Sequence, residues 1–181
     1  MFFAYWRARR ANRLLIDQIH GEIVAAARAP ALYRENGVAD TIEGRFEMIV
    51  LHAALVTRRL LALGSQGAEM AQELVDRVFR GFEDALREMA IGDAGVARRI
   101  KTMAGDFAGR SRAYAAALDS GDEAGLAAAL ARNVYGATTP PPEATGLVRR
   151  VVAAAAALDR TPIEDFAATR FRFPAAEGEP R

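Results

Sequence analysis

The sequence predicts an all-α protein, a single-domain bundle of about six to seven helices. Apolar residues recur at spacings of three and four along almost the whole chain, which is typical of amphipathic helices. There is no sustained alternation of apolar and polar residues between hairpin turns, so strands are not expected. With 181 residues, 51% of them hydrophobic, the chain can bury one substantial core but not two.

The first helix is expected to run from near the N-terminus to about Ala27, because isoleucines and alanines recur there with helical spacing. Pro30 then prevents its continuation. Residues 32–39 contain Asn36-Gly37, a pair that tolerates left-handed dihedral angles. We therefore expect a connecting loop over these residues.

A second helix is expected after Asp40 or Thr41 as its N-cap, with Glu43 in the position of a capping box. The glycines of residues 64–67 are expected to end it. Its buried stripe is predicted to consist of Ile42, Phe46, Ile49, Val50, Ala53 and Leu60.

The third and fourth helices, residues 68–89 and 94–118, are separated by Gly92-Asp93, which supplies a stop and a fresh N-cap. The third helix has an acidic outer face. Its apolar face is predicted to consist of Leu74, Val75, Val78, Phe79, Phe82, Leu86 and Met89. In the fourth helix, Gly105 and Gly109 are expected to allow the close approach of a neighbouring element.

A fifth helix begins at an Asp122 cap, and the prolines of residues 140–142 form an extended connector after it. An alanine-rich helix follows, and then a short helix that Thr161 caps, with Pro162 at its first position. The predicted divisions are a basic and aromatic N-terminal helix (1–29), core helices (30–136), C-terminal helices (137–172) and a frayed tail (173–181).

The composition argues against several kinds of chemistry. The chain has no cysteine and only two histidines, His20 and His52, so disulfides, thiolate metal sites and the usual zinc sites are not expected, and no cofactor is predicted. No apolar run is long enough to cross a bilayer. The first residues are aromatic before they are basic, the reverse of a secretory signal, so a cytoplasmic protein is expected.

No residue pattern indicates catalysis. Residues 92–95, Gly-Asp-Ala-Gly, lack the preceding strand and the lysine of a phosphate-binding loop. Adjacent carboxylates such as Glu83-Asp84 lie on solvated faces, where no burial prepares them for acid–base work. The chain is therefore not expected to be an enzyme.

Two polar residues occupy apolar positions. His52 lies at the edge of the buried stripe of its helix, where a packed, hydrogen-bonded histidine is expected and a ligand or proton-transfer role is the alternative. Arg110 lies between Phe107 and Tyr114 on the apolar side of its helix and needs a buried partner. It either forms a structural ion pair or lines a recognition groove.

Two basic clusters indicate surfaces for binding. The cations of the fourth helix either complement the acidic third helix or form a protein-docking surface. Specific nucleic-acid binding is not expected there, because interleaved stacking aromatics are missing. These cations are Arg98, Arg99, Lys101 and Arg112.

The N-terminus combines aromatic and cationic residues, as does a segment that lies at an anionic bilayer surface. The alternative is that the aromatic residues cap the core of the domain. The residues of this predicted membrane-surface segment are Phe2, Phe3, Tyr5, Trp6, Arg7, Arg9, Arg10 and Arg13.

Three stretches of the sequence resemble the ubiquinol–cytochrome c chaperone family. The first comprises Leu32-Tyr33-Arg34, residues 37–47 (GVADTIEGRFE) and Leu51-His52. The second comprises Arg87-Glu88-Met89, Gly92-Asp93, Val96, residues 101–104 (KTMA), Phe107, Gly109-Arg110 and Ala113-Tyr114. The third is residues 130–135 (LARNVY). Together the three span most of the chain, and their joint order is highly specific.

The resemblance implies an all-helical, non-enzymatic assembly factor of the cytochrome bc complex (respiratory complex III), which binds newly synthesised cytochrome b at the cytoplasmic face of the inner membrane. Mitochondrial members act with a small partner protein near the ribosomal exit, so a small partner protein or the ribosome is a further candidate partner. The client-docking face is expected to involve Arg45, Glu47, His52, Arg98, Arg99, Lys101, Arg110 and Arg112. The alternative is a haem- or small-ligand-binding helical protein with His52 as axial ligand.

Overall fold

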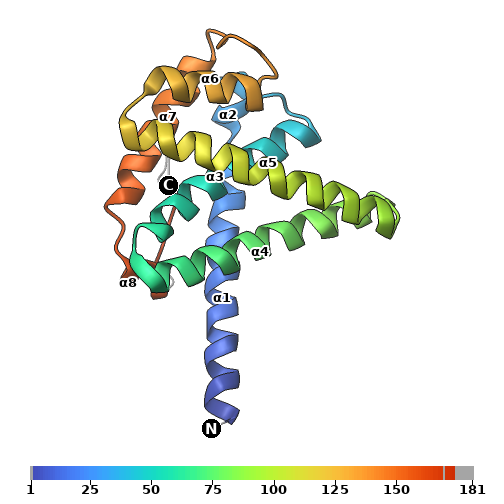
Figure 1. The fold of residues 1–181 in the computed structure, drawn as a ribbon, viewed down its shortest axis with the longest axis vertical. Coiled ribbons are helices and arrows are strands. Elements are labelled where there is room, and N and C mark those ends of the chain that lie inside the picture. Colours follow the sequence, from blue (N-terminus) through green and yellow to red (C-terminus); the bar gives the residue numbers. More distant parts are fainter. Residues whose placement is uncertain (1, 169, 174–181) are drawn as a thin grey trace.

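The computed structural model describes residues 2–168 and 170–173, with side chains from residue 12 onward (Figure 1). All regular structure over these residues is helical, which confirms the predicted all-α, single-domain bundle. The helices are α1 (Phe2–Ala27), α2 (Pro30–Arg34), α3 (Ile42–Leu61), α4 (Gly64–Glu88), α5 (Asp93–Ser120), α6 (Glu123–Val134), α7 (Ala144–Asp159) and α8 (Ile163–Ala167).

Helix α3 lies at the centre of the bundle and contacts α1, α4, α5, α6 and α7. Its residues 50–56, Val-Leu-His-Ala-Ala-Leu-Val, carry no carboxylate, ammonium or guanidinium group, and all are buried. A helix that is apolar on every side has to be covered on every side. The other long helices therefore pack around α3, and its position fixes theirs.

The helices extend from this centre in different directions. Figure 1 shows α4 and α5 running side by side away from the bundle and meeting at a tip on the right. Helices α6 and α7 pack against each other at the opposite end of α5. The N-terminal half of α1 extends downward beyond all the other helices.

The predicted caps are confirmed in part. Thr41 is the N-cap of α3, and its hydroxyl oxygen accepts a hydrogen bond from the Gly44 N–H at 3.1 Å. The capping box from Asp40 is wrong, because the Asp40 carboxylate instead pairs with the Arg45 guanidinium at 2.7 Å. Asp122 caps α6 as predicted and accepts a backbone N–H of that helix at 2.8 Å.

The loop predicted for residues 32–39 is wrong over its first part, which belongs to α2. Pro30 ends α1, but the fixed φ angle of proline also suits the first turn of the next helix. Leu32 is then buried in the core, and this burial holds the short helix in place.

The glycines of residues 64–67 do not end α3, as was predicted, but begin the next helix. Helix α3 ends at Leu61, and α4 begins at Gly64. Gly67 is buried, and a Cβ atom there would overlap the Leu60 carbonyl oxygen. This glycine therefore serves the close approach of two helices rather than a stop.

Two residues predicted to be buried are exposed, and two glycines of α5 predicted to allow close approach face open space. Ile42 and Met89 are 63% and 48% exposed, since each lies at the end of its helix, away from the core. Gly105 and Gly109 permit no close approach among the described residues, because a Cβ atom at either would meet no atom within 4 Å.

Two predictions at the C-terminal end are wrong. Thr161 does not cap α8: its hydroxyl donates to the Ala157 carbonyl oxygen at 3.3 Å, and the N-cap position is taken by Pro162. Phe173, the first residue of the predicted frayed tail, is half-buried against His52. The remainder of that predicted tail, 174–181, lies outside the described residues.

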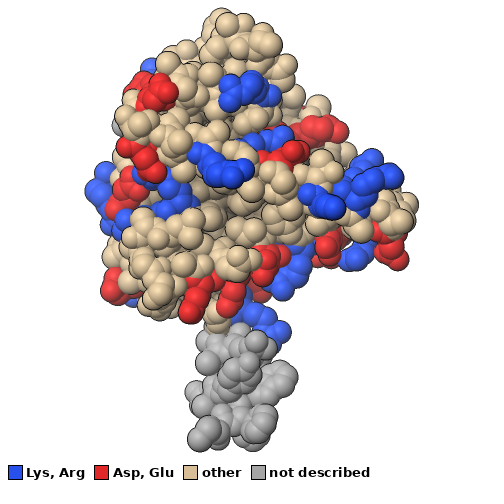
Figure 2. Space-filling model, viewed as in Figure 1, with Lys and Arg blue, Asp and Glu red and all other residues tan. Residues whose placement is uncertain are grey.

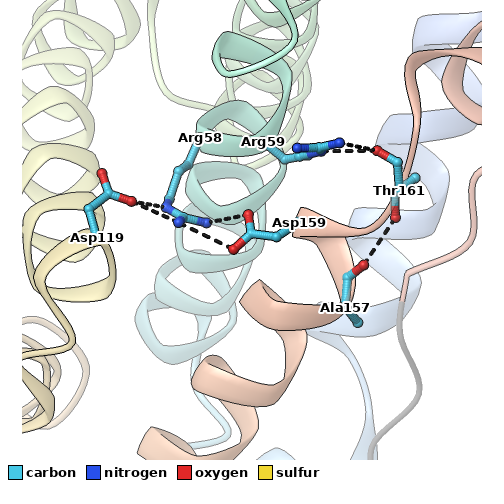
Figure 3. Close-up of polar contacts among 6 residues, drawn as sticks. All are labelled: Arg58, Arg59, Asp119, Ala157, Asp159 and Thr161. Atoms are coloured by element: carbon cyan, nitrogen blue, oxygen red, sulfur yellow. Dashed lines mark hydrogen bonds and ion pairs between the residues drawn. The ribbon is translucent and has the colours of Figure 1, made fainter.

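Arg58 joins the end of α3 to two other helices (Figure 3). Its guanidinium donates to Asp119 of α5 and to Asp159 of α7, each at 2.8 Å. The neighbouring Arg59 donates two hydrogen bonds, of 2.9 and 2.8 Å, to the Thr161 carbonyl oxygen. These contacts fix the C-terminal end of α7 against α3.

Gly44→Ala is expected to lower the free energy of unfolding by roughly 2–4 kcal/mol, because its Cβ would overlap the Ala39 carbonyl oxygen. Urea unfolding followed by circular dichroism measures this. Gly105→Ala is the matched control, since an alanine at this open, exposed mid-helix position should raise the free energy of unfolding by up to about 1 kcal/mol. Equal stability of the two variants would contradict the close packing at Gly44.

Candidate functional site: a groove between three helices

A half-open groove of about 1150 Å³ lies between α1, α3 and α7, and α2 and the C-terminal segment border it. Alanines from α1 and α7 face leucines from α3 across this groove, and their side chains are too short to fill the space between the helices. The residues concerned are Ala25, Ala26, Leu51, Leu55, Ala153, Ala154 and Ala157. The wall is therefore mainly apolar.

Charged side chains from α1, α2, α7 and the C-terminal segment also line the groove. They are Glu22, Glu35, Arg149, Arg150, Arg160 and Arg172. Two ion pairs cross from one element to another: Arg150 to Glu35 at 3.3 Å, and Arg172 to Glu22 at 3.6 Å. The arginines outnumber the glutamates, so the groove has a net positive border.

His52 lies in the wall of the groove and is only 8% exposed. Its Nδ1 donates to the Met48 carbonyl oxygen at 2.7 Å, since a carbonyl can only accept. The ring packs against Phe173, with 4.8 Å between the centroids. Burial lowers the pKa of His52 to about 4, so the ring is neutral at pH 7. The structure thus shows the packed, hydrogen-bonded histidine that the sequence predicts.

Arg110 has the buried partner that its position requires. Its Nη2 lies 3.0 Å from Oε1 of Glu47, and the two side chains are 18% and 12% exposed. Burial raises the pKa of Glu47 to about 7, although the Arg110 charge acts in the opposite direction. This pair ties α3 to α5, as a structural ion pair does.

Other polar groups lie near the Glu47–Arg110 pair, but among the described residues one atom of each partner is left without a hydrogen bond. Asp106 lies 3.9 Å from Nη1 of Arg110, and the Tyr114 hydroxyl accepts a hydrogen bond from Asn133 at 3.1 Å. Burial raises the pKa of Tyr114 to about 12. Within the described part of the chain, Oε2 of Glu47 and Nη1 of Arg110 are buried without a hydrogen-bond partner.

The remaining predicted residues are exposed. Arg45 pairs with Asp40 at the start of α3, where both side chains face solvent. Figure 2 shows basic side chains along α5 toward the tip of the α4–α5 hairpin and acidic ones along the edge of α4. The exposed cations of α5 are Arg98, Arg99, Lys101 and Arg112. Over the described residues these four form no ion pair, so of the two alternatives left open by the sequence, direct pairing with acids of α4 does not occur.

The eight residues predicted to shape one docking face therefore lie in four places. His52 lines the groove, Glu47 pairs with Arg110 between α3 and α5, and Arg45 pairs with Asp40 at the exposed start of α3. The other four lie on the exposed face of α5. In the predicted membrane-surface segment, Arg13 is exposed. Its other members, Phe2 to Arg10, lie outside the side chains that the structure describes.

Sequence reasoning missed most of the groove. From the alanines of α7 the sequence predicts only a helix, and it indicates no binding role for Glu22 or Phe173. The sequence shows that residues 153–157 of α7 are all alanine, but it does not show which helix these short side chains face.

The described residues contain neither a metal-binding cluster nor a membrane-spanning helix. Among residues 12–168 and 170–173, no three His, Cys, Asp or Glu side chains come together in a way that could hold a metal ion. Over the same described residues, no helix combines the length and the apolar character that a membrane span requires.

Comparison with known proteins places these features in a family context. Residues 34–173 match the family described as ubiquinol-cytochrome C chaperone. A crystal structure described as the Cbp3 homolog from Brucella abortus is similar over 97% of both chains, with a TM-score of 0.85 and 36% sequence identity. None of the curated proteins matches at a significant level.

His52→Asn is expected to reduce the acid sensitivity of the fold. The pKa of His52 is about 4 in the folded state and 6.5 ordinarily, so the unfolded chain binds the proton first and stability is lost as the pH falls from 6.5 toward 4. From pH 7.5 to pH 5 the wild type should therefore lose about 2 kcal/mol more than the variant, whose amide can still donate to Met48. Urea unfolding at both pH values measures this.

Because wild type and His52→Asn share all their other titrating groups, the difference between them cancels the contributions of those groups to the pH dependence. His20 has a pKa lowered to about 4 by burial and acts in the same direction. Glu47 has a raised pKa, so its contribution is present below pH 4.5 and is lost as the pH rises through about 7. An identical pH dependence in the wild type and the variant would contradict the burial of a neutral His52.

Proposed function

The chain belongs to the ubiquinol–cytochrome c chaperone family, whose role is in the assembly of respiratory complex III, and we propose that it holds newly synthesised cytochrome b in the groove between α1, α3 and α7. The observation that carries this proposal is the half-open apolar groove of about 1150 Å³. We further propose that the protein acts by binding alone and catalyses no reaction.

The dimensions of the groove favour a polypeptide segment over a small molecule. Small-molecule pockets are typically about 300–1,000 Å³ and enclose most of their ligand. The groove is larger than that range, and it is open along one side. Its alanine and leucine walls can cover apolar side chains that an unassembled membrane protein would otherwise expose to water.

The charges along the groove support the same kind of ligand. Arg149 and Arg160 are exposed on the α7 side of the groove and lie eleven residues apart, which is about 16 Å along a helix. Two cations at this separation can each meet a polar or acidic group that flanks a short apolar segment. The apolar wall between them would then cover the segment itself.

We also propose that the N-terminal helix brings the protein to the cytoplasmic face of the inner membrane. Support comes from the sequence, which places aromatic and cationic residues together at the start of the chain. The N-terminal half of α1 extends beyond the other helices, so a surface could meet it without obstruction from the bundle (Figure 1).

The exposed face of α5 is the proposed docking surface for a small partner protein or the ribosome. Arg98, Arg99, Lys101 and Arg112 form no ion pair among the described residues, and none of them lines the groove. A second polypeptide could therefore occupy this face while the groove holds the client.

A haem-handling role for His52 is the alternative. Its Nε2 carries no proton when Nδ1 donates to Met48, so this nitrogen could in principle bind iron. The Phe173 ring packs against the imidazole, however, and haem would have to displace it. A Soret shift that depends on His52 would support this alternative over the proposed client groove.

Ala153→Trp is expected to reduce the recovery of cytochrome b with the tagged protein by about tenfold or more, because the indole would enter the groove. Ala156→Trp is the matched control: Ala156 is also exposed on α7 but does not line the groove, so recovery should be unchanged. Affinity purification from detergent-solubilised cells, with immunoblotting for cytochrome b, measures both.

The same purification separates the two proposed surfaces. Arg98→Glu combined with Lys101→Glu should leave cytochrome b recovery intact if only the groove holds the client, and should reduce it if the α5 face contributes. Equal recovery with Ala153→Trp and Ala156→Trp would contradict the groove as the client site.

A further inference from the structure

The C-terminal segment occupies one end of the groove with two of its own side chains. Arg172 and Phe173 both line the groove, although they lie more than 110 residues from the α1 and α3 residues they meet. Their contacts show which chemical groups this end of the groove accepts.

Glu22 of α1 provides the polar half of this site. Its carboxylate accepts a hydrogen bond from the Phe173 backbone N–H at 3.3 Å and lies 3.6 Å from the Arg172 guanidinium. One carboxylate thus meets a cation and the backbone N–H of the residue that follows it. A carboxylate has lone pairs enough for both contacts.

Aromatic rings provide the apolar half. The Phe173 ring lies 4.8 Å from His52 and 6.4 Å from Phe171, measured between centroids. Phe171 is buried and stacks on Phe166 at 4.8 Å, so it anchors the segment. Phe173 extends beyond this anchor and is only half-buried.

We propose that this end of the groove recognises a client segment in which a cationic residue precedes an aromatic one, and that Arg172-Phe173 fills the site until such a segment displaces it. The inference rests on the proposed function of the groove and adds the kind of sequence that it selects. The Glu22 carboxylate would pair with the cation and accept a hydrogen bond from the backbone of the client segment. The rings of His52 and Phe171 would contact its aromatic side chain.

The contacts of Arg172 and Phe173 are weak enough for another segment to displace these two residues. The Arg172 side chain is 63% exposed, and an exposed ion pair contributes little to stability. Displacement of Phe173 leaves Phe171 anchored in the core, so the fold keeps its C-terminal attachment. The resident pair still competes strongly, because it is tethered beside the site.

Full-length Phe173→Ala should therefore bind a fluorescein-labelled peptide with the sequence of residues 168–175 about tenfold or more tightly than the wild type does, as measured by fluorescence anisotropy. The same peptide with alanine at the positions of both Phe171 and Phe173, which removes each cation–aromatic pair, should bind at least about tenfold more weakly. Glu22→Gln combined with Phe173→Ala should also lose binding, because the carboxylate that meets the cation is gone.

Equal binding of the labelled peptide by the wild type and Phe173→Ala, or binding by neither, would overturn the inference. If Phe173→Ala does not fold, the wild type provides the test. Millimolar peptide should displace Phe173 and thereby shift the His52 ring proton resonances in NMR spectra. Unchanged resonances would overturn the inference. These assays contain no cytochrome b, so a negative result would contradict the peptide site but not the proposed client groove. Conversely, if the purification experiment contradicts the client groove, a positive peptide result remains valid.

Discussion

The packing of the whole bundle is arranged around the buried middle of α3. Seven consecutive residues of this helix are buried, and the segment contains no fully charged side chain. The other long helices therefore surround α3, and its polar contacts are made near its two ends. Glu47 reaches α5 near one end, while Arg58 reaches α5 and α7 near the other. His52, the one titratable group inside the segment, stays neutral and bonds to its own helix.

The groove follows from how this central helix is covered. Between α1 and α7 the covering is incomplete, because the facing residues of both helices are alanines and the space above Leu51 and Leu55 stays open. Hydrogen bonds from Arg58 to Asp159 and from Arg59 to the Thr161 carbonyl oxygen join the C-terminal end of α7 to α3. The C-terminal segment then enters one end of the opening with Phe173. A helical bundle with one incompletely covered side suits a protein that holds another polypeptide.

Most of the fold could be predicted from the sequence, but little of the site could. Helix periodicity located the long helices, and the apolar position of Arg110 predicted either a buried ion pair or a recognition groove, of which the structure shows the ion pair with Glu47. Periodicity does not say where a helix leaves the core, so Ile42 and Met89 were wrongly placed inside. The groove depends on how alanines from α1 and α7 face each other, and such a juxtaposition has no local signature. Phe173 was missed for the same reason, since its contacts lie in α1 and α3.

We infer that this helical bundle assists the assembly of respiratory complex III, and we propose that it does so by holding a subunit. The most direct test is the amount of assembled cytochrome bc complex in membranes of host cells that lack the gene, compared with the same cells expressing it again from a plasmid. Blue-native electrophoresis with immunoblotting for the complex, and for an unrelated respiratory complex as reference, gives that amount. We expect a selective loss of the cytochrome bc complex in cells that lack the gene, and its recovery when the plasmid supplies the gene. A normal level of the assembled complex without the gene would contradict it.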